Sequence, residues 1–286
     1  MLISIASGKG GTGKTTVATN LFQVAGETAT YADCDVEEPN GRLFLHPQIA
    51  GDYACNVTVP QVDYSKCTFC GACREACRFN AIAVLPKSVM VFQELCHGCG
   101  NCRLACPERA ITEVERTIGR IEHGTAAEGA FVEGRLNVGE AMSPPVIRTV
   151  RQHVGDEGLI LVDAPPGTSC PVIAAVNHTD YCVLVTEPTP FGLHDLKLAV
   201  EMVRAVGLPH GVVINRADLG DERTRDYCRA EGIEILAEIP ADRRIAEAYV
   251  AGKLAVDELP EIKQLFVALL EKITDRVMRS RGDEQL

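Results

Sequence analysis

The sequence predicts an α/β protein whose doubly wound, mostly parallel sheet is interrupted by a small, cysteine-rich α+β domain. Two observations predict this arrangement. Short β-branched runs alternate with segments in which apolar residues recur at helical spacing, as expected for buried parallel strands joined by crossover helices. The alternation stops between about Gly51 and Gly124, where the pattern becomes short and turn-rich, and eight of the 13 cysteines lie between Cys67 and Cys106.

The strands that we expect from these runs cover residues 2–6, 158–163, 181–186 and 211–214. The crossover helices cover residues 17–24, 170–177, 195–206, 224–231 and 243–251. A further helix over residues 261–278 places seven apolar side chains on one stripe, a pattern shared by core-packing helices and membrane-surface helices. The mixed charge of its flanks favours packing against the core.

The interruption divides the chain into three segments. Residues 1–57 form the first part of the main domain, residues 58–115 the insert, and residues 116–286 the second part of the main domain. Residues 111–115 and 119–122 are expected to be short strands that return to the main domain. Pro144 and Pro145 then open a helix that leads to the strand at residues 158–163.

The composition is that of a globular protein with a full core, since 46% of the 286 residues are hydrophobic and 23% are charged. With 28 Lys and Arg against 39 Asp and Glu, the formal charge is -11, which disfavours nucleic acid and anionic membrane as partners. No apolar run approaches the roughly 18 residues that span a bilayer. Residues 1–6 are apolar but lead into a glycine loop instead of a cleavage site. We therefore expect a cytoplasmic protein with no nucleic-acid partner and no membrane insertion.

A glycine-rich loop follows the first expected strand and precedes the first expected helix. Its sequence, Gly8-Lys9-Gly10-Gly11-Thr12-Gly13-Lys14-Thr15, matches the GxxxxGK[ST] pattern in the context that this pattern requires. The glycines let backbone N–H groups surround phosphate oxygens, Lys14 neutralises the β- and γ-phosphates, and Thr15 offers its hydroxyl to Mg²⁺. A chance glycine-rich turn is the alternative. The expected nucleotide-binding residues of this loop are Gly8, Gly10, Gly11, Thr12, Gly13, Lys14, Thr15 and Thr16.

Lys9 adds a second lysine early in the loop, and with it the sequence resembles the deviant Walker A ATPases, whose loop reads KGGxGK[ST]. This group of P-loop NTPases of the SIMIBI type contains MinD, ParA, Mrp and the nitrogenase iron protein. The resemblance implies that the ligands are ATP and Mg²⁺. It also implies that Lys9 reaches the partner's nucleotide in an ATP-dependent homodimer, or in a heterodimer with a paralogous ATPase. A solvated loop lysine is the alternative.

Further stretches extend the resemblance over most of the chain outside the insert. The apolar strand that ends at Asp163 resembles a Walker B strand, which implies that Asp163 holds Mg²⁺ directly or through water, and residues 165–168 are similar to the second switch of the Mrp branch. Asp35 stands where the family has the aspartate that orients the attacking water, with a capping or turn role as its alternative. The resemblance therefore makes Lys9, Lys14 and Asp35 the catalytic residues, and it places Asn215 and Pro240 against adenine.

The cysteines of the insert form two groups with the same spacing. The spacing x2, x2, x3 within each group is that of bacterial ferredoxins, in which the fourth ligand of each cluster comes from the other group. Zinc is the main competitor, but four cysteines at this spacing fit poorly to paired CxxC ligands. The ferredoxin resemblance predicts two 4Fe-4S clusters, one held by Cys67, Cys70, Cys73 and Cys106 and the other by Cys77, Cys96, Cys99 and Cys102. Arg78 departs from the pattern, because proline usually follows the fourth cysteine, and it is expected to alter the local backbone.

Side-chain charge distinguishes the insert from the rest of the chain. Between residues 63 and 112, six basic side chains stand against four acidic ones, whereas the whole chain is strongly acidic. This balance suggests an intramolecular or acidic partner. A purely structural role for the clusters, as staples of a small fold, is the alternative to electron transfer.

The remaining five cysteines are scattered singly. Cys170 lies seven residues after Asp163, at the offset of a cluster-ligating cysteine of the nitrogenase iron protein, although a small buried thiol at a helix start is the favoured interpretation. Cys55, Cys182 and Cys228 are expected in the core, and Cys34 adjoins Asp35 without a ligand role. Cys228 has no nearby partner cysteine, which disfavours the CxxC site of Mrp-type scaffolds.

The whole chain resembles MinD-superfamily ATPases with an inserted ferredoxin domain, which occur largely in anaerobes and sometimes with the orange-protein metallocluster system. The resemblance leaves three functions open. The first is an ATP-gated electron donor or maturation factor for a redox or metallocluster partner protein. The others are a MinD-like positioning or partition ATPase and an iron-sulfur assembly scaffold of the Mrp type. Because the insert lies between Asp35 and Asp163 in sequence, we expect ATP-driven dimer closure to be coupled to the clusters.

Overall fold

The computed structural model describes residues 1–127 and 129–283 and is built on a nine-stranded sheet in the order β11-β10-β9-β1-β8-β2-β7-β6-β3. The strands from β11 to β7 are parallel, and β6 and β3 are added antiparallel at one edge. The fold class predicted from the sequence is therefore confirmed. The strands are β1 Leu2–Ala6, β2 Ala29–Asp33, β3 Gln48–Val62, β6 Ile111–Ala126, β7 Gly129–Leu136, β8 Leu159–Asp163, β9 Tyr181–Thr186, β10 His210–Asn215 and β11 Ile235–Ile239.

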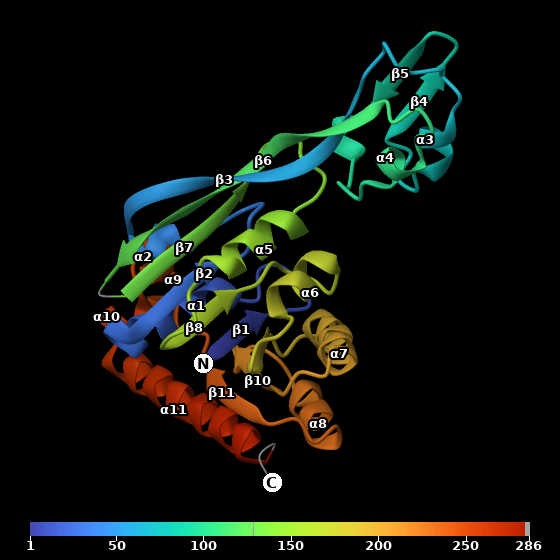
Figure 1. The fold of residues 1–286 in the computed structure, drawn as a ribbon. Helices are drawn as coiled ribbons and strands as arrows, with labels where there is room; N and C mark the ends of the chain where they lie inside the picture. The colour runs from blue at the N-terminus through green and yellow to red at the C-terminus, as the bar shows by residue number, and fades with distance from the viewer. Residues whose placement is uncertain (128, 284–286) are drawn as a thin grey trace.

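Helices cover both faces of this sheet (Figure 1). On one face, Ile3 and Ile5 of β1 share a core with α1 and α11, and on the other, Leu184 of β9 shares a core with α5, α6 and α7. Burial on both faces explains why the parallel strands read as continuous apolar runs. The helices of the main domain are α1 Lys14–Ala25, α2 Arg42–Leu45, α5 Pro144–Gln152, α6 Cys170–Val176, α7 Pro190–Ala205, α8 Arg223–Ala230, α9 Arg243–Val250, α10 Ala255–Glu258 and α11 Pro260–Asp283, with a 3-10 turn η1 at Gly26–Thr28.

The C-terminal helix packs as its stripe predicts. Ile262, Phe266, Leu269, Ile273 and Val277 of α11 are buried in the core that includes α1 and the sheet. Within residues 1–127 and 129–283, no helix combines the length and the apolarity needed to cross a bilayer. The amphipathic stripe is thus covered by the protein's own core.

Strands β3 and β6 form a long antiparallel ribbon that leaves the sheet. Residues 119–125 of β6 pair with both β3 and β7, whereas residues 111–117 pair with β3 alone. The register shifts between Cys55 and Asn56, opposite Ile118, so a β-bulge marks the point where the ribbon departs. The expectation of two short strands at 111–115 and 119–122 is therefore wrong. They are parts of one strand, because pairing with β3 continues across the bulge.

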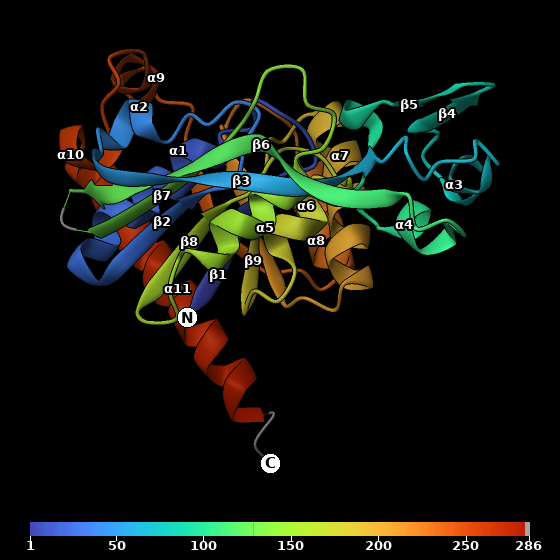
Figure 2. The same ribbon diagram turned by 45° about the horizontal axis from the view of Figure 1, so that its top comes forward.

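A small cysteine-rich module lies at the tip of this ribbon, well away from the main sheet in both views (Figures 1 and 2). It comprises α3 Ala72–Ala76, the hairpin of β4 Ile82–Leu85 and β5 Ser88–Val91, the 3-10 turn η2 Gln93–Leu95, and α4 Asn101–Ala105. We call residues 63–110 the module, and residues 56–62 with 111–117 the arm. The expected insert boundaries, at residues 58 and 115, fall inside the arm.

Candidate functional site

The glycine loop occupies the turn between β1 and α1, at the carboxyl edge of the parallel sheet. Gly11 and Gly13 adopt positive φ angles of 79° and 91°, which L side chains rarely adopt. The Gly13 carbonyl accepts the Val17 amide at 2.9 Å, so the loop runs directly into the first turn of α1. The backbone of Gly8 lies so close to Asp195 that a Cβ atom would come within 2.1 Å of its carbonyl oxygen. These glycines therefore let the loop curl tightly at a helix N-terminus, where anions bind.

One buried hydroxyl in the loop lacks an internal partner. Thr12 is 2% exposed, and its Oγ1 has no hydrogen-bond partner among the described residues. Buried hydroxyls are almost always hydrogen-bonded in native proteins. Thr15 and Thr16 are half-buried in the first turn of α1. The orphaned hydroxyl and the positive-φ glycines fit a loop that encloses an external phosphate.

Lys14 lies among carboxylates that end neighbouring strands. Its Nζ is 2.8 Å from Asp163 Oδ1 at the end of β8 and 3.8 Å from Asp35 Oδ2 just after β2. Burial by itself would lower the pKa of Lys14, but Asp163 and Asp35 outweigh this effect and raise it. The ammonium is therefore held charged at the position where the phosphate-loop pattern needs it. The structure brings Lys14, Asp35 and Asp163 together, as their expected roles require.

Asp35 is partly buried beside this lysine. Burial raises the pKa of its carboxyl to about 6, with Lys14 opposing the shift and Asp163 adding to it. A carboxyl with such a pKa is largely ionised at pH 7 and accepts protons readily, as a group that orients or activates water should.

Asp33 and Tyr31 belong to the same site, although the sequence analysis gave them no role. The Asp33 carboxylate is fully buried and accepts the backbone N–H groups of Asp35 at 3.1 Å and of Gly41 at 2.9 Å. Burial and nearby Asp163 raise the pKa of Asp33 well above its ordinary value. The Tyr31 hydroxyl donates to Asp163 Oδ2 at 3.0 Å. The only local signal for Asp33 was its position as an acid at the end of an apolar strand. Tyr31 had no local signal, because aromatic residues are common in strands.

The two residues expected near adenine lie on the β10 and β11 side of the loop. The Asn215 side chain donates to the Thr12 carbonyl at 2.8 Å and accepts from the Arg216 amide at 3.0 Å. Pro240 is exposed just after β11. Asn215 therefore touches the phosphate loop directly, whereas Pro240 is exposed at the end of the neighbouring strand β11. Lys9 is half-buried in the loop, and its carbonyl accepts from the Ser7 hydroxyl at 2.8 Å.

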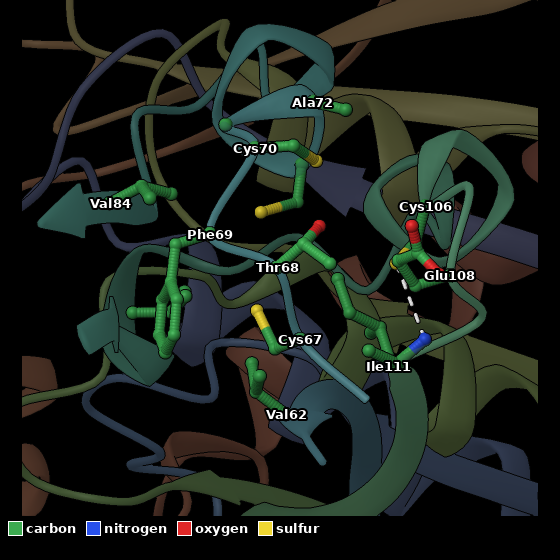
Figure 3. A pocket seen from close by; sticks show the side chains of 14 residues that line it. Val62, Cys67, Thr68, Phe69, Cys70, Ala72, Val84, Cys106, Glu108 and Ile111 are labelled. Atoms are coloured by element: carbon green, nitrogen blue, oxygen red, sulfur yellow. Dashed lines mark hydrogen bonds between the residues drawn. The ribbon is translucent and has the colours of Figure 1, made fainter. Parts of the chain in front are cut away.

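The module contains two hollows, each lined by one of the predicted sets of four cysteines. Cys67, Cys70, Cys73 and Cys106 line the first, and Figure 3 shows their side chains around it, with Cys67, Cys70 and Cys106 labelled, together with Val62 and Phe69. Cys77, Cys96, Cys99 and Cys102 line the second. The hollows hold about 360 and 410 Å³ of space, counting the part open to solvent. All 13 cysteines are free thiols, so no disulfide competes for these sulfurs.

The two cysteine loops share their backbone geometry. Cys77 Sγ accepts the Ala81 amide at 3.4 Å, and Cys106 Sγ accepts the Ala110 amide at 3.3 Å, four residues on in each case. The second of these bonds is drawn in Figure 3. Cys77 and Cys106 also have nearly equal backbone angles, with φ of -83° and -77° and ψ of 106° and 111°. The cysteine before Arg78 and the cysteine before the proline of the second group therefore have the same backbone conformation. The expectation that Arg78 alters the local backbone is wrong.

A stacked pair of aromatic rings lines the second hollow. Phe79 and His97 both line it, and their rings stack with centroids 3.6 Å apart. No sequence pattern links the two residues of this pair, which are 18 positions apart, so the pair could not be predicted. Amide hydrogen bonds to sulfur and an apolar lining both suit thiolates that ligate a cluster.

The remaining cysteines are away from these hollows. Cys55, Cys182 and Cys228 are buried, as expected, and Cys34 is buried as well. Cys170 is exposed at the start of α6, so the favoured interpretation of this thiol as a small buried side chain is wrong.

Comparison with known proteins places this geometry in a family. A family model described as the CobQ/CobB/MinD/ParA nucleotide binding domain matches residues 3–256. The chain is 29% identical over 265 residues to the uncharacterized protein MJ0579 of Methanocaldococcus jannaschii, covering 88% of this chain and 90% of that protein. It is 24% identical over 313 residues to an iron-sulfur cluster carrier protein of Pyrococcus furiosus, covering 98% and 88%. Among solved structures, the septum site-determining protein MinD of Pyrococcus horikoshii, complexed with Mg-ADP, superposes with a TM-score of 0.58 at 23% identity, covering 95% and 94%.

Proposed function

Because the chain belongs to the CobQ/CobB/MinD/ParA family of nucleotide-binding domains, we propose that it is an ATPase in which ATP-dependent dimerisation gates electron transfer or metallocluster maturation of a partner protein. The ATPase activity is common to MinD and ParA relatives. The finer proposal adds two 4Fe-4S clusters in the module and a coupling between the two sites.

In the ATPase reaction, this chain's own residues bind and orient the reactants. The loop from Gly8 to Thr16 surrounds the phosphates, and Lys14 neutralises the β- and γ-phosphates. Thr15 and Asp163 are the residues that would hold Mg²⁺, which supplies charge neutralisation on the transferred phosphoryl group. Asp35 orients the attacking water, and Lys9 contacts the partner's nucleotide. The buried Lys14 ammonium, 2.8 Å from Asp163, supports these assignments.

In the module, the residues that would hold the clusters are the two sets of four cysteines already described. A 4Fe-4S cluster supplies one-electron chemistry when it is bound. The arrangement of each set around one hollow supports this assignment, as does the similarity to an iron-sulfur cluster carrier protein.

The coupling rests on how the module is attached. Residue 42 opens α2 only seven positions after Asp35, and α2 leads within three residues into β3, whose last residues, 56–62, belong to the arm. A rearrangement of the Asp35 segment therefore has a continuous covalent path to the module, through α2 and β3. This continuity is the observation that carries the proposal.

The proposal is tested on the anaerobically reconstituted protein. Cluster midpoint potentials, the rate of iron loss to a chelator and the oligomeric state are measured without nucleotide, with Mg-ADP and with Mg-ATP. Asp35→Ala, which should bind but not hydrolyse ATP, gives the trapped state. We expect ATP to change the oligomeric state together with at least one cluster property. If nucleotide leaves all three unchanged, the coupling does not exist.

An iron-sulfur carrier is the second candidate, favoured by the similarity to the Pyrococcus furiosus carrier protein. A carrier transfers its cluster intact to an apoprotein, whereas an electron-transfer module keeps it. Incubation with an iron-free ferredoxin separates the two functions. Net transfer of iron, accelerated by ATP, would establish the carrier.

A further inference from the structure

A buried carboxylate and a partly buried one face each other where the arm joins the sheet. Glu122 of β6 and Glu133 of β7 are direct partners in the antiparallel register, and the Glu133 side chain is completely buried. Burial raises the pKa of Glu133, while Arg135 and Arg42 oppose the shift. Like charges directly opposite one another destabilise a sheet, so this pair needs cations.

Three arginines supply this charge, from two different parts of the molecule. Arg120 and Arg135 belong to the same two strands: Arg120 Nη2 lies 3.2 Å from Glu122, and Arg135 Nε lies 2.6 Å from Glu133. Arg42 comes from α2. It places Nη2 2.6 Å from Glu122 Oε2 and Nε 3.2 Å from Glu133 Oε2, so one guanidinium spans both acids.

Arg42 is also tied to the nucleotide site. The preceding residue, Gly41, donates its amide to Asp33, and Asp33 also accepts the Asp35 amide, so one buried carboxylate holds both ends of the segment between Asp35 and Gly41. A Cβ atom at Gly41 would come within 2.4 Å of the Tyr31 hydroxyl, which donates to Asp163. Contacts therefore run without a gap from Asp163 and Asp35 to Arg42.

We propose that Arg42 is the positioning residue that transmits the state of the nucleotide site to the base of the arm, through its paired contacts with Glu122 and Glu133. This rests on the proposed coupling and identifies the residue that carries it. A shift of the Asp35 segment moves Gly41, and hence the guanidinium that contacts Glu122 of β6 and Glu133 of β7. The opposite end of β6 carries the module.

We expect the protein to stay folded when Arg42 is removed. In Arg42→Ala, Glu133 keeps Arg135 and Glu122 keeps Arg120, so neither carboxylate becomes an unpaired buried charge. The lost contact is the one between α2 and the strands. Arg120→Ala is a matched control, because it removes one arginine from the same Glu122 without touching α2.

The test is backbone hydrogen exchange of residues 119–126 in the full, cluster-loaded protein, with and without a non-hydrolysable ATP analogue and Mg²⁺. We expect the analogue to change exchange in this segment in the wild type and in Arg120→Ala, and this change to be lost in Arg42→Ala and in Glu122→Gln. Nucleotide affinity, basal ATP hydrolysis by the monomer and iron content should match the wild type in Arg42→Ala, which shows that the variant is folded.

The outcomes separate the inference from the proposed function. If Arg42→Ala keeps the wild-type exchange response, or if the wild type has none, the inference is overturned. A cluster response to ATP in either case would leave the proposed coupling standing through another path. An Arg42-dependent exchange response with no change in the clusters would support the inference and overturn the coupling.

Discussion

Lys14 and its acids show how single residues set the chemistry of the nucleotide site. Three carboxylates at the ends of adjacent strands converge on one buried cation, and Asp33 and Asp163 have no exposed surface. Such a cluster is tolerated only because each carboxylate accepts a hydrogen bond or faces the ammonium. The arrangement explains both the pKa of Asp35 and the fixed position of Lys14.

The pH dependence of hydrolysis should report Asp35. Because its pKa in the free protein is about 6 and the ionised form orients water, kcat/KM for ATP should rise with pH and level off above about pH 6. Below that value the rate should fall about tenfold per pH unit. The measurement is steady-state phosphate release between pH 5 and 8. Asp35→Asn should lower the rate and abolish this acid limb, and an unchanged limb in that variant would assign it to another group.

Gly13 is expected to tolerate no side chain. A Cβ atom there would lie 2.2 Å from Asn215 Nδ2 on a backbone with φ of 91°, so Gly13→Ala should lose about 1–3 kcal/mol of stability and weaken ATP binding. Gly10→Ala is the control, since its Cβ meets nothing within 4 Å. Its stability should change by less than about 0.5 kcal/mol. Thermal unfolding compares the stability of the two variants, and nucleotide titration measures ATP binding by Gly13→Ala. Equal losses of stability in the two variants would refute the steric argument.

At the scale of elements, the module is a repeat of one cysteine loop and one short helix. α3 and α4 each follow a glycine with positive φ, Gly71 and Gly100, and each ends at the last cysteine of its group. The last cysteine of each loop lies against the hollow of the other loop. Two such loops cannot separate without opening both hollows.

This crossing gives a prediction about iron content. Removing two ligands from one hollow, as in Cys67→Ser with Cys106→Ser, should lose one cluster, or about four irons per chain. Cys67→Ser with Cys77→Ser takes one ligand from each hollow and should perturb both clusters. Iron analysis and low-temperature paramagnetic resonance distinguish the two results. If the first pair disturbs both clusters equally and the second only one, the ligand sets do not cross.

At the scale of the whole molecule, the sheet and the arm have different roles. The sheet brings the strand ends together at the nucleotide site, and the arm carries the module away from the body while staying continuous with it (Figure 2). The proposed coupling between the nucleotide site and the module therefore depends on the junction of α2, β3, β6 and β7.

Lys9 should decide whether two copies associate. With Mg²⁺ and a non-hydrolysable ATP analogue, the wild type should sediment as a dimer, and Lys9→Ala should remain a monomer that still binds nucleotide. Lys87→Ala removes an exposed lysine from the module and serves as the charge-matched control. Sedimentation velocity measures the result. A nucleotide-dependent dimer of Lys9→Ala would show that this lysine is an ordinary loop residue.

The sequence by itself determined the features that are local in the chain. The glycine loop and the cysteine groups can each be recognised from a few neighbouring residues. The loop depends on local backbone conformation, and the cysteine groups depend on the spacing of their ligands. The parallel strands β1, β8, β9 and β10 are read from burial on both faces. Strand β7 was missed because Gly129 and Gly134 weaken its pattern, although a Cβ atom at Gly134 would clash with Val150 and Val36.

Only the tertiary structure decided how the two sites are joined. The bond from Arg42 to Glu122 spans 80 positions, and that from Tyr31 to Asp163 spans 132. Side chains so far apart leave no periodicity or spacing in the sequence, since their proximity follows from strand order and register. The sequence therefore identified the residues that we propose to carry the chemistry, whereas the fold alone revealed the contacts of Asp33 and Arg42 and the arm between the two sites, because contacts made by chain crossover have no local signal.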